Sequence, residues 1–277
     1  MARKVNLNAY FERIGFAGSI APNLATLELI HALHPAAIPF ENLDPLLGLT
    51  VSLDQASLER KLLAERRGGY CYEHNTLLMS VLEELDYAVK GLAARVLWNH
   101  PDAVDVPRSH MLLAIEMSGT THIADVGFGG LTLTAPLRLR ADLEQETPHG
   151  VFRLTGGDPE WRLEAKTGED WRVLYAFDLT EWSEADYEAA NVTAMGPESP
   201  FTRELRVALS PAGKRYTLLN NRLTTRNAGE PAEERLLTSV AEMREVLSGL
   251  FGINLPSAEL LDPKLEALLA EAGVEAS

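Results

Sequence analysis

The sequence predicts an α+β fold in which a helical segment, a strand-rich segment and a mixed segment follow one another along the chain. Apolar residues recur at helical spacing up to residue 88. Short runs rich in β-branched and aromatic residues dominate from Lys90 to Leu205, and both patterns occur after that. The 277 residues also exceed the usual size of a single domain. We therefore expect two or three packed units, and the changes of pattern divide the chain into residues 1–88, 89–203 and 204–277.

The first unit is expected to consist of helices. One helix is predicted near Tyr10–Ile14, and a second is marked by Leu24, Leu27, Ile30 and Leu33. Prolines 22, 35, 39 and 45 are expected to separate helices. The turn Arg67-Gly68-Gly69 leads into a further helix, whose buried stripe is Leu77, Leu78, Val81, Leu82 and Leu85. Cys71 therefore lies at or near the start of that helix.

The second and third units are expected to contain most of the strands. In the second unit, strands are predicted at 94–98, 111–115, 122–126 and 171–175, and Ser118-Gly119-Thr120 is a hairpin turn between two of them. The third unit has predicted strands at 206–209 and 216–219, followed by helices at 233–250 and 258–272.

The charge of the chain limits the classes of ligand that it can bind. A formal charge of −15 disfavours nucleic acids and anionic membrane surfaces, which repel a protein without a strong basic patch. No stretch approaches the ~18 apolar residues that span a bilayer, and the first residues are polar. We expect a cytoplasmic protein with a small-molecule ligand and no membrane or nucleic-acid partner.

Cys71 is the strongest candidate for a reactive residue. It is the single cysteine of the chain, which excludes a disulfide framework and a multi-cysteine metal cluster. In the block from Arg66 to Asn75, a flexible glycine pair presents this thiol at a helix start, where the positive end of the helix dipole favours the thiolate. A neighbouring imidazole would complete a nucleophile. The alternative is that Cys71 is an inert packing residue.

Two residues of the predicted hairpin are candidate partners of Cys71. His110 begins one apolar strand and Asp125 interrupts the next, so a turn at Ser118–Thr120 brings them near the same end of the hairpin. Asp125 alternatively binds backbone amides only. His74 is a second candidate base, because it follows Cys71 by three residues on a helix. No metal site is expected, since no His-Glu-x-x-His or paired-cysteine pattern occurs.

Taken together, these motifs resemble those of the arylamine N-acetyltransferases over nearly the whole chain. The segment Arg67-Gly68-Gly69-Tyr70-Cys71-Tyr72-Glu73-His74-Asn75 resembles the nucleophile motif of that family. Supporting similarities occur in the same order as in the family, at residues 10–15, 38–43, 109–111, 125–129 and 201–205.

The resemblance implies a fold, a catalytic triad and a reaction. The expected fold is a helical bundle, a β-barrel and an α/β lid around a cysteine-protease-like core with the triad Cys71–His110–Asp125, and Glu41 is expected to pair with Arg67. The expected reaction transfers acetyl from acetyl-CoA through a Cys71 thioester to a small aromatic amine or hydrazine, by a ping-pong mechanism. Handling of foreign amines, as a monomer or homodimer and without a metal, is implied as well.

The resemblance, together with the residue types, implies the following contacts with the two substrates. Phe128, Phe201 and Phe40 are expected to form apolar walls for the aromatic acceptor. Acetyl-CoA is expected to contact Ser109, Gly129, Trp98, Lys214 and Arg215. The stretch from Arg203 to Arg226 has six basic residues and one acidic residue, so it is expected to attract the phosphates of CoA.

Two other functions use the same residues differently. A papain- or transglutaminase-like hydrolase would use a Cys-His-Asp triad to cleave amides or esters. A binding protein without turnover would keep Cys71 as a packing residue. Acyl transfer that an added amine accelerates distinguishes the transferase from both.

Overall fold

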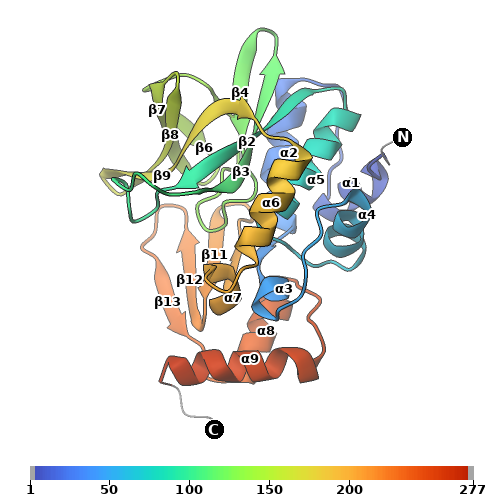
Figure 1. Cartoon of the computed structure of the whole chain (residues 1–277), viewed down its shortest axis with the longest axis vertical. Coiled ribbons are helices and arrows are strands. Elements are labelled where there is room, and N and C mark those ends of the chain that lie inside the picture. The colour runs from blue at the N-terminus through green and yellow to red at the C-terminus, as the bar shows by residue number, and fades with distance from the viewer. Residues whose placement is uncertain (1–3, 274–277) are drawn as a thin grey trace.

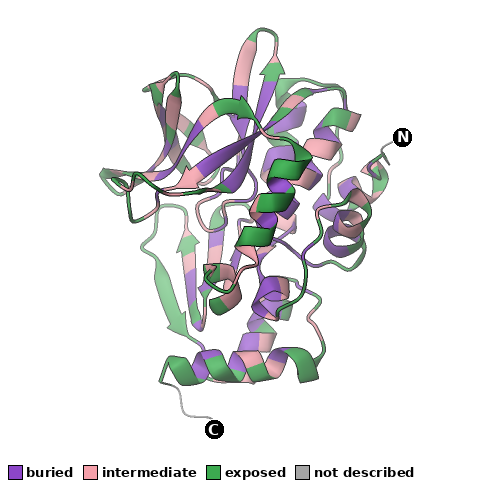
Figure 2. Ribbon diagram, viewed as in Figure 1, coloured by how far each residue is buried: buried purple, intermediate pink, exposed green. Residues whose placement is uncertain are grey.

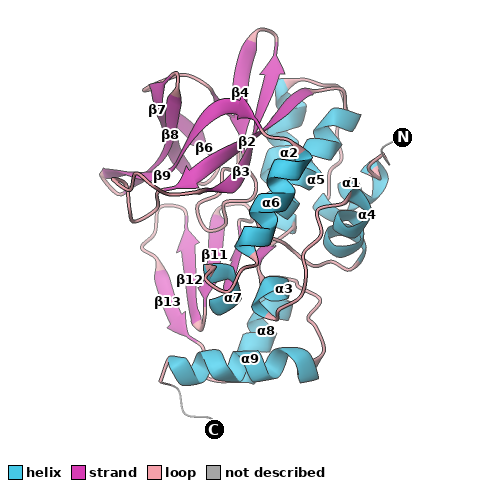
Figure 3. Cartoon of the chain, viewed as in Figure 1, coloured by secondary structure: helices cyan, strands magenta, loops and turns pink. Residues whose placement is uncertain are grey.

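The structure is a computed structural model that describes residues 4–273, and it has the predicted α+β fold (Figures 1 and 3). A helical bundle packs against an eight-stranded antiparallel sheet that forms a nearly closed barrel. A second antiparallel sheet, of five strands, lies beneath the barrel and is covered by the C-terminal helices. Three apolar clusters hold these parts together. One combines the bundle with barrel residues such as Met111 and Leu113, one lies within the barrel, and one combines the second sheet and the C-terminal helices with Leu43 and Leu46 of the bundle. The exact limits of the three units, 1–88, 89–203 and 204–277, stay predictions.

The helical bundle contains the elements α1 (Leu7–Ile14), α2 (Leu24–Ala37), β1 (Phe40–Glu41), α3 (Leu43–Leu46), α4 (Gln55–Leu58), the π-helical η1 (Glu59–Ala64) and α5 (Cys71–Glu84). The side-chain oxygen of Asn23 accepts the N–H of Thr26 at 3.0 Å, which fixes the start of α2. The expectation that Pro35 and Pro45 separate helices was wrong, because they lie inside α2 and α3. Pro35 lies in the last turn of α2, so the hydrogen bond that its missing N–H removes is lost near the end of the helix.

The barrel contains β2 (Ala88–Val96), β3 (Arg108–Met117), β4 (Thr120–Ala124), β5 (Leu137–Arg138), β6 (Gln145–Thr147), β7 (Gly150–Gly157), β8 (Glu160–Thr167) and β9 (Asp170–Glu181). Their order is β5-β4-β3-β2-β9-β8-β7-β6. The two end strands meet through one side chain: Gln145 accepts the N–H of Arg138 at 2.8 Å and donates to its carbonyl at 3.0 Å. This contact nearly closes the sheet.

Two helices that the sequence analysis missed follow the barrel, α6 (Glu184–Ala194) and α7 (Pro200–Arg203). Ser183 and Asp186 cap the start of α6 reciprocally, a signal that the strand-rich interpretation of this stretch overlooked. The outer face of α6 is exposed (Figure 2). On its inner face Tyr187 donates to Leu92 of the barrel at 3.1 Å, and Asn191 donates to Val51 of the bundle at 2.9 Å. The helix therefore joins the two units.

The C-terminal part contains β10 (Arg206–Leu209), β11 (Lys214–Leu219), β12 (Arg222–Asn227), β13 (Glu233–Leu236), α8 (Val240–Glu245), the π-helical η2 (Val246–Leu250) and α9 (Ala258–Glu271). β1 of the bundle pairs with β10, so the first and last parts share one sheet. The expectation of a helix from Glu233 was wrong, because residues 233–236 form a strand that pairs with β12. The helix begins after Ser239, which caps it. Within residues 4–273, no helix is long and apolar enough to cross a bilayer.

Candidate active site

Cys71 is the first residue of α5 and follows a tightly packed turn. The glycines before it serve close approach, rather than the flexibility that we expected. A Cβ on Gly68 would lie 1.9 Å from the carbonyl oxygen of Pro39, and one on Gly69 would lie 2.5 Å from the carboxylate of Glu73. The same carboxylate accepts the N–H of Tyr70 at 3.0 Å and so fixes the start of the helix. The sulfur lies 3.8 Å from the carbonyl oxygen of Ser109.

The hairpin of β3 and β4 brings His110 and Asp125 together. Ser118 and Gly119 form the turn with φ of 49° and 74°, and Met117 pairs with Thr120. This register places His110 near the beginning of β3 and Asp125 one residue beyond β4. The Nε2 of His110 donates to Oδ2 of Asp125 at 2.7 Å, and both residues are buried.

The electrostatics of the pair favour a charged imidazole. Burial alone would lower the pKa of His110, but the charge and hydrogen bond of Asp125, together with a hydrogen bond to Cys71, raise it to about 10. Burial likewise opposes the ionisation of Asp125, yet His110 and the N–H of Gly127 keep the pKa of that carboxyl below its ordinary value. Since Nε2 of His110 is bound to Asp125, Nδ1 is the ring nitrogen left for the sulfur.

Asp125 is held by residues from several parts of the chain. Its Oδ1 accepts from Asn75 at 3.0 Å and from the N–H of Gly127 at 2.9 Å, and the hydroxyl of Tyr175 donates to Oδ2 at 3.1 Å. The alternative in which Asp125 binds backbone amides is therefore true in part. Sequence reasoning gave no role to Tyr175, because nothing in a strand pattern marks which hydroxyl will meet a residue fifty positions away.

His74, the alternative base, faces away from this arrangement. A buried chain of hydrogen bonds joins Tyr10 to Nδ1 of His34 at 2.9 Å, Nε2 of His34 to Nδ1 of His74 at 2.8 Å, and Nε2 of His74 to the carbonyl of Pro39 at 3.1 Å. Both ring nitrogens of His74 are thus occupied. Burial lowers its pKa to about 4, so it is neutral at pH 7.

The three aromatic residues predicted to form acceptor walls come from different elements, and Phe128 is the one with a direct contact to a triad residue in the described structure. The rings of Phe128 and His110 meet edge to face, with centroids 5.2 Å apart. Phe40 packs against Phe201 at 6.2 Å and stacks on His74 at 6.4 Å. Gly127 lies closer still to the nucleophile, since a Cβ there would be 2.8 Å from the Cα of Cys71.

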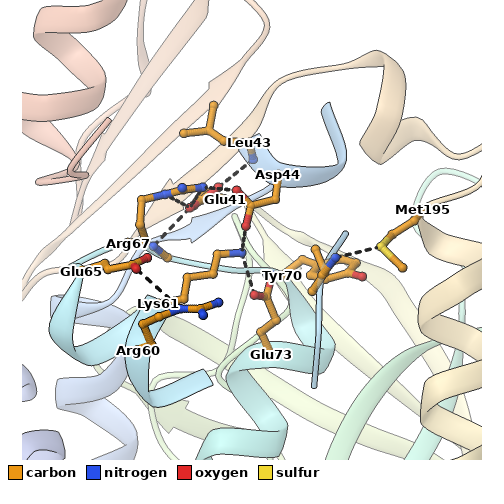
Figure 4. A network of polar contacts seen from close by, with 12 residues as sticks. Glu41, Leu43, Asp44, Arg60, Lys61, Glu65, Arg67, Tyr70, Glu73 and Met195 are labelled. Atoms are coloured by element: carbon orange, nitrogen blue, oxygen red, sulfur yellow. Dashed lines mark hydrogen bonds and ion pairs between the residues drawn. The ribbon is translucent and has the colours of Figure 1, made fainter. Parts of the chain in front are cut away.

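A buried network of ion pairs supports the turn before Cys71 (Figure 4). Arg67 donates to Glu41 at 2.8 Å, the pairing that the resemblance implies, and also to Asp44 at 2.8 Å. Lys61 joins Asp44 to Glu73, with both distances 2.6 Å. Glu41 also accepts the N–H of Leu43 at 2.7 Å. These contacts tie η1, the turn and α3 together behind the nucleophile.

The predicted CoA contacts occupy different environments. Ser109 and Lys214 are exposed, and Trp98 is half-buried with the guanidinium of Arg172 5.9 Å above its ring. Gly129 is buried with φ of 86°, and a Cβ there would touch the ring of Phe40. Arg215 differs from the surface position that we expected, because it is buried and hydrogen-bonded within the protein.

The chain is similar to known proteins over nearly its whole length. A family model described as N-acetyltransferase matches residues 23–260. The chain is 42% identical over 255 residues to an arylamine N-acetyltransferase of Escherichia coli, covering 91% of this chain and 90% of that protein. The arylamine N-acetyltransferase structure from M. tuberculosis has a TM-score of 0.91 and 38% identity, covering 96% of this chain and 100% of that one. The Mycobacterium marinum structure in complex with CoA has a TM-score of 0.89 and 36% identity, covering 96% and 99%.

Proposed function

The chain belongs to the arylamine N-acetyltransferase family, and we propose that it acetylates arylamines and arylhydrazines through a thioester on Cys71. The observation that carries this proposal is the buried arrangement of Cys71, His110 and Asp125. The relative solved with CoA supports acetyl-CoA as the donor. No metal is needed for this chemistry.

In the first half-reaction the sulfur of Cys71 attacks the thioester carbonyl of acetyl-CoA. A carbon–sulfur bond to Cys71 forms, the bond to the CoA sulfur breaks, and His110 gives its Nδ1 proton to the departing CoA thiolate. One thioester replaces another of similar energy, so the step is reversible and the acetyl group stays activated. Backbone N–H groups at the N-terminus of α5 are the oxyanion donors in this proposal.

In the second half-reaction the amine attacks acetyl-Cys71. His110, now neutral, takes the proton of the amine nitrogen while the carbon–sulfur bond breaks, which restores the thiolate and the imidazolium. Asp125 fixes the orientation of His110 and stabilises its charged form, as in the serine-protease triad. The raised pKa of His110 and the lowered pKa of Asp125 support this division of roles.

The substrate contacts complete the proposal. Phe128, Phe201 and Phe40 form apolar surfaces for the ring of the acceptor. Ser109, Gly129 and Trp98 contact CoA, and exposed Lys214 attracts its phosphates. Arg215 contributes to CoA binding through the loop that it holds. Handling of foreign aromatic amines in the cytoplasm is part of the same proposal.

Steady-state kinetics with both substrates varied test the function. Parallel double-reciprocal lines are expected for acetyl-CoA against an arylamine such as p-anisidine, because CoA leaves before the amine enters. Cys71→Ala should remove the activity. The control Arg235→Met, on the exposed edge strand β13, should leave it unchanged. Intersecting lines would contradict the ping-pong mechanism, and turnover of acetyl-CoA that the amine does not accelerate would favour a hydrolase.

A further inference from the structure

Arg215 is a buried cation that has no carboxylate partner within residues 4–273. It lies on β11 and is 4% exposed. Its guanidinium donates to the carbonyl of Thr132 at 2.9 Å, to the carbonyl of Gly130 at 3.3 Å and to the hydroxyl of Ser210 at 3.2 Å, while its Nε is unpartnered. The residue directly opposite on β12 is another cation, Arg226.

This placement has a free-energy cost that an apolar side chain would avoid. A buried charge loses its hydration, and only neutral dipoles compensate it here. Burial and the charge of Arg226 lower the pKa of Arg215 to about 10, so it remains charged at neutral pH. Both carbonyl groups that bind Arg215 belong to one loop. The buried charge therefore holds that loop in position.

The loop at residues 127–132 connects Arg215 to the active site. The hydroxyl of Thr132 donates to the carbonyl of Asp125 at 2.9 Å and accepts the N–H of Phe128 at 3.3 Å. The Thr132 carbonyl, on the same residue, is the one that Arg215 binds at 2.9 Å. A path of hydrogen bonds therefore connects Arg215 through Thr132 to Phe128. The ring of Phe128 in turn contacts that of His110 edge to face.

The fit between β11 and the loop is close along its length. Arg215 and Thr217 lie two residues apart and so face the same side of the strand. A Cβ on Gly130 would be 2.9 Å from the methyl group of Thr217, so the loop backbone lies directly on this side. Gly129 of the same loop packs over the ring of Phe40, which lies on the same face of the sheet, since Phe40 pairs with Ala208 and Ala208 with Thr217. The loop thus lies across this face, against one predicted acceptor wall, while it carries another.

We propose that Arg215 is a positioning residue that sets the preference for aromatic acceptors, by holding the loop so that Phe128 forms a fixed wall beside His110. The inference rests on the proposed acetyl transfer through Cys71. Removing the guanidinium leaves the carbonyls of Gly130 and Thr132 without their donor, and the loop no longer holds Phe128 against the acceptor ring. A small acceptor that does not use this wall is then affected much less than an aromatic one.

The experiment compares aminolysis of the acetyl-enzyme by two acceptors. p-Nitrophenyl acetate acetylates Cys71, and the burst of p-nitrophenol counts acetylated sites, so rates are compared per acetyl-enzyme. For Arg215→Met, the KM of p-anisidine is expected to rise about tenfold relative to that of hydrazine, the factor expected when one aromatic contact is lost. Arg215→Lys should restore part of the preference, because an ammonium group can still donate to one carbonyl.

Two further variants keep the result decisive if Arg215→Met folds poorly. Thr132→Val removes the hydroxyl in the middle of the path and should shift the ratio of the two KM values in the same direction. Arg235→Met, an exposed arginine of the same sheet, should not shift it. Equal losses for both acceptors, or an unchanged ratio, would overturn the role of Arg215. Absence of a burst in the unmodified protein would instead overturn the thioester mechanism.

Discussion

Replacement of Arg67 by methionine tests whether the buried ion network holds the turn before the nucleophile. The Glu41 side chain is fully buried and those of Arg67 and Asp44 are only 11% and 13% exposed. In Arg67→Met, Glu41 keeps the hydrogen bonds from the N–H groups of Leu43 and Gly68 but loses its ion pair with the guanidinium. Removing one partner of a buried ion pair costs about 3–5 kcal/mol, so we expect the free energy of unfolding to fall by that amount.

Equilibrium urea unfolding at pH 7, followed by circular dichroism, measures this loss. The control is Arg203→Met, whose partner Glu198 is 88% exposed and whose own side chain is 56% exposed. Exposed pairs contribute roughly 0–1 kcal/mol, so the control should change little. The double variant with Glu41→Gln should lose less than the sum of the two single variants, since the second change removes the stranded charge.

Two results would contradict a stabilising role of the Arg67–Glu41 pair. If the free energy of unfolding of Arg67→Met lies within about 1 kcal/mol of that of the unmodified protein, the network stabilises the fold less than its burial implies. If the two single variants are additive, Glu41 and Arg67 are not energetically coupled, despite the 2.8 Å contact between them. In either case, the close packing of Gly68 and Gly69 alone would have to position Cys71.

Three further changes have defined expectations. Gly127→Ala places a Cβ 2.8 Å from the Cα of the nucleophile, so kcat/KM should fall about 100-fold or more, whereas Gly157→Ala, with open space around its Cβ, should leave it unchanged. Tyr175→Phe removes one hydrogen bond to Asp125 and should lower kcat/KM about tenfold at unchanged circular dichroism; an unchanged rate would mean that the hydroxyl is dispensable. Acid should destabilise the fold between pH 6.5 and 4.5. Burial lowers the pKa of all three histidines of the bundle, two of them to about 4, so the unfolded chain binds more protons in this range. Glu73, with its pKa raised to about 7 by burial, acts in the opposite direction but offsets only one of them. Urea midpoints at pH 7 and pH 5 measure the difference, and equal midpoints would contradict it.

The part of the site that the sequence predicts well is the part that local geometry determines. Ser118-Gly119 is a two-residue turn, so the register of its hairpin places His110 and Asp125 at the same end. The glycines before Cys71 mark the start of a helix in the same local way. The partners of Asp125 come from distant strands and helices, and no local pattern says that Tyr175 will reach it.

Arg215 shows why the charge pattern alone was misleading. The count of basic residues from Arg203 to Arg226 treats each one as a surface charge, but alternate residues of a strand face opposite sides. Lys214 faces solvent and Arg215 faces the loop at residues 127–132. Which of the two is buried depends on what packs against β11, and that is decided by contacts with another unit. The strand β13 was missed for a similar reason, since its partner β12 supplies the backbone pairing.

Intact-mass measurement after mixing with acetyl-CoA, in the absence of an acceptor, shows directly whether Cys71 carries the acetyl group. We expect an adduct of about 42 Da, the mass that one acetyl group adds, located on the peptide that contains Cys71 and lost when an arylamine is added. No adduct, or one that remains on the chain after Cys71→Ala, would contradict the thioester mechanism.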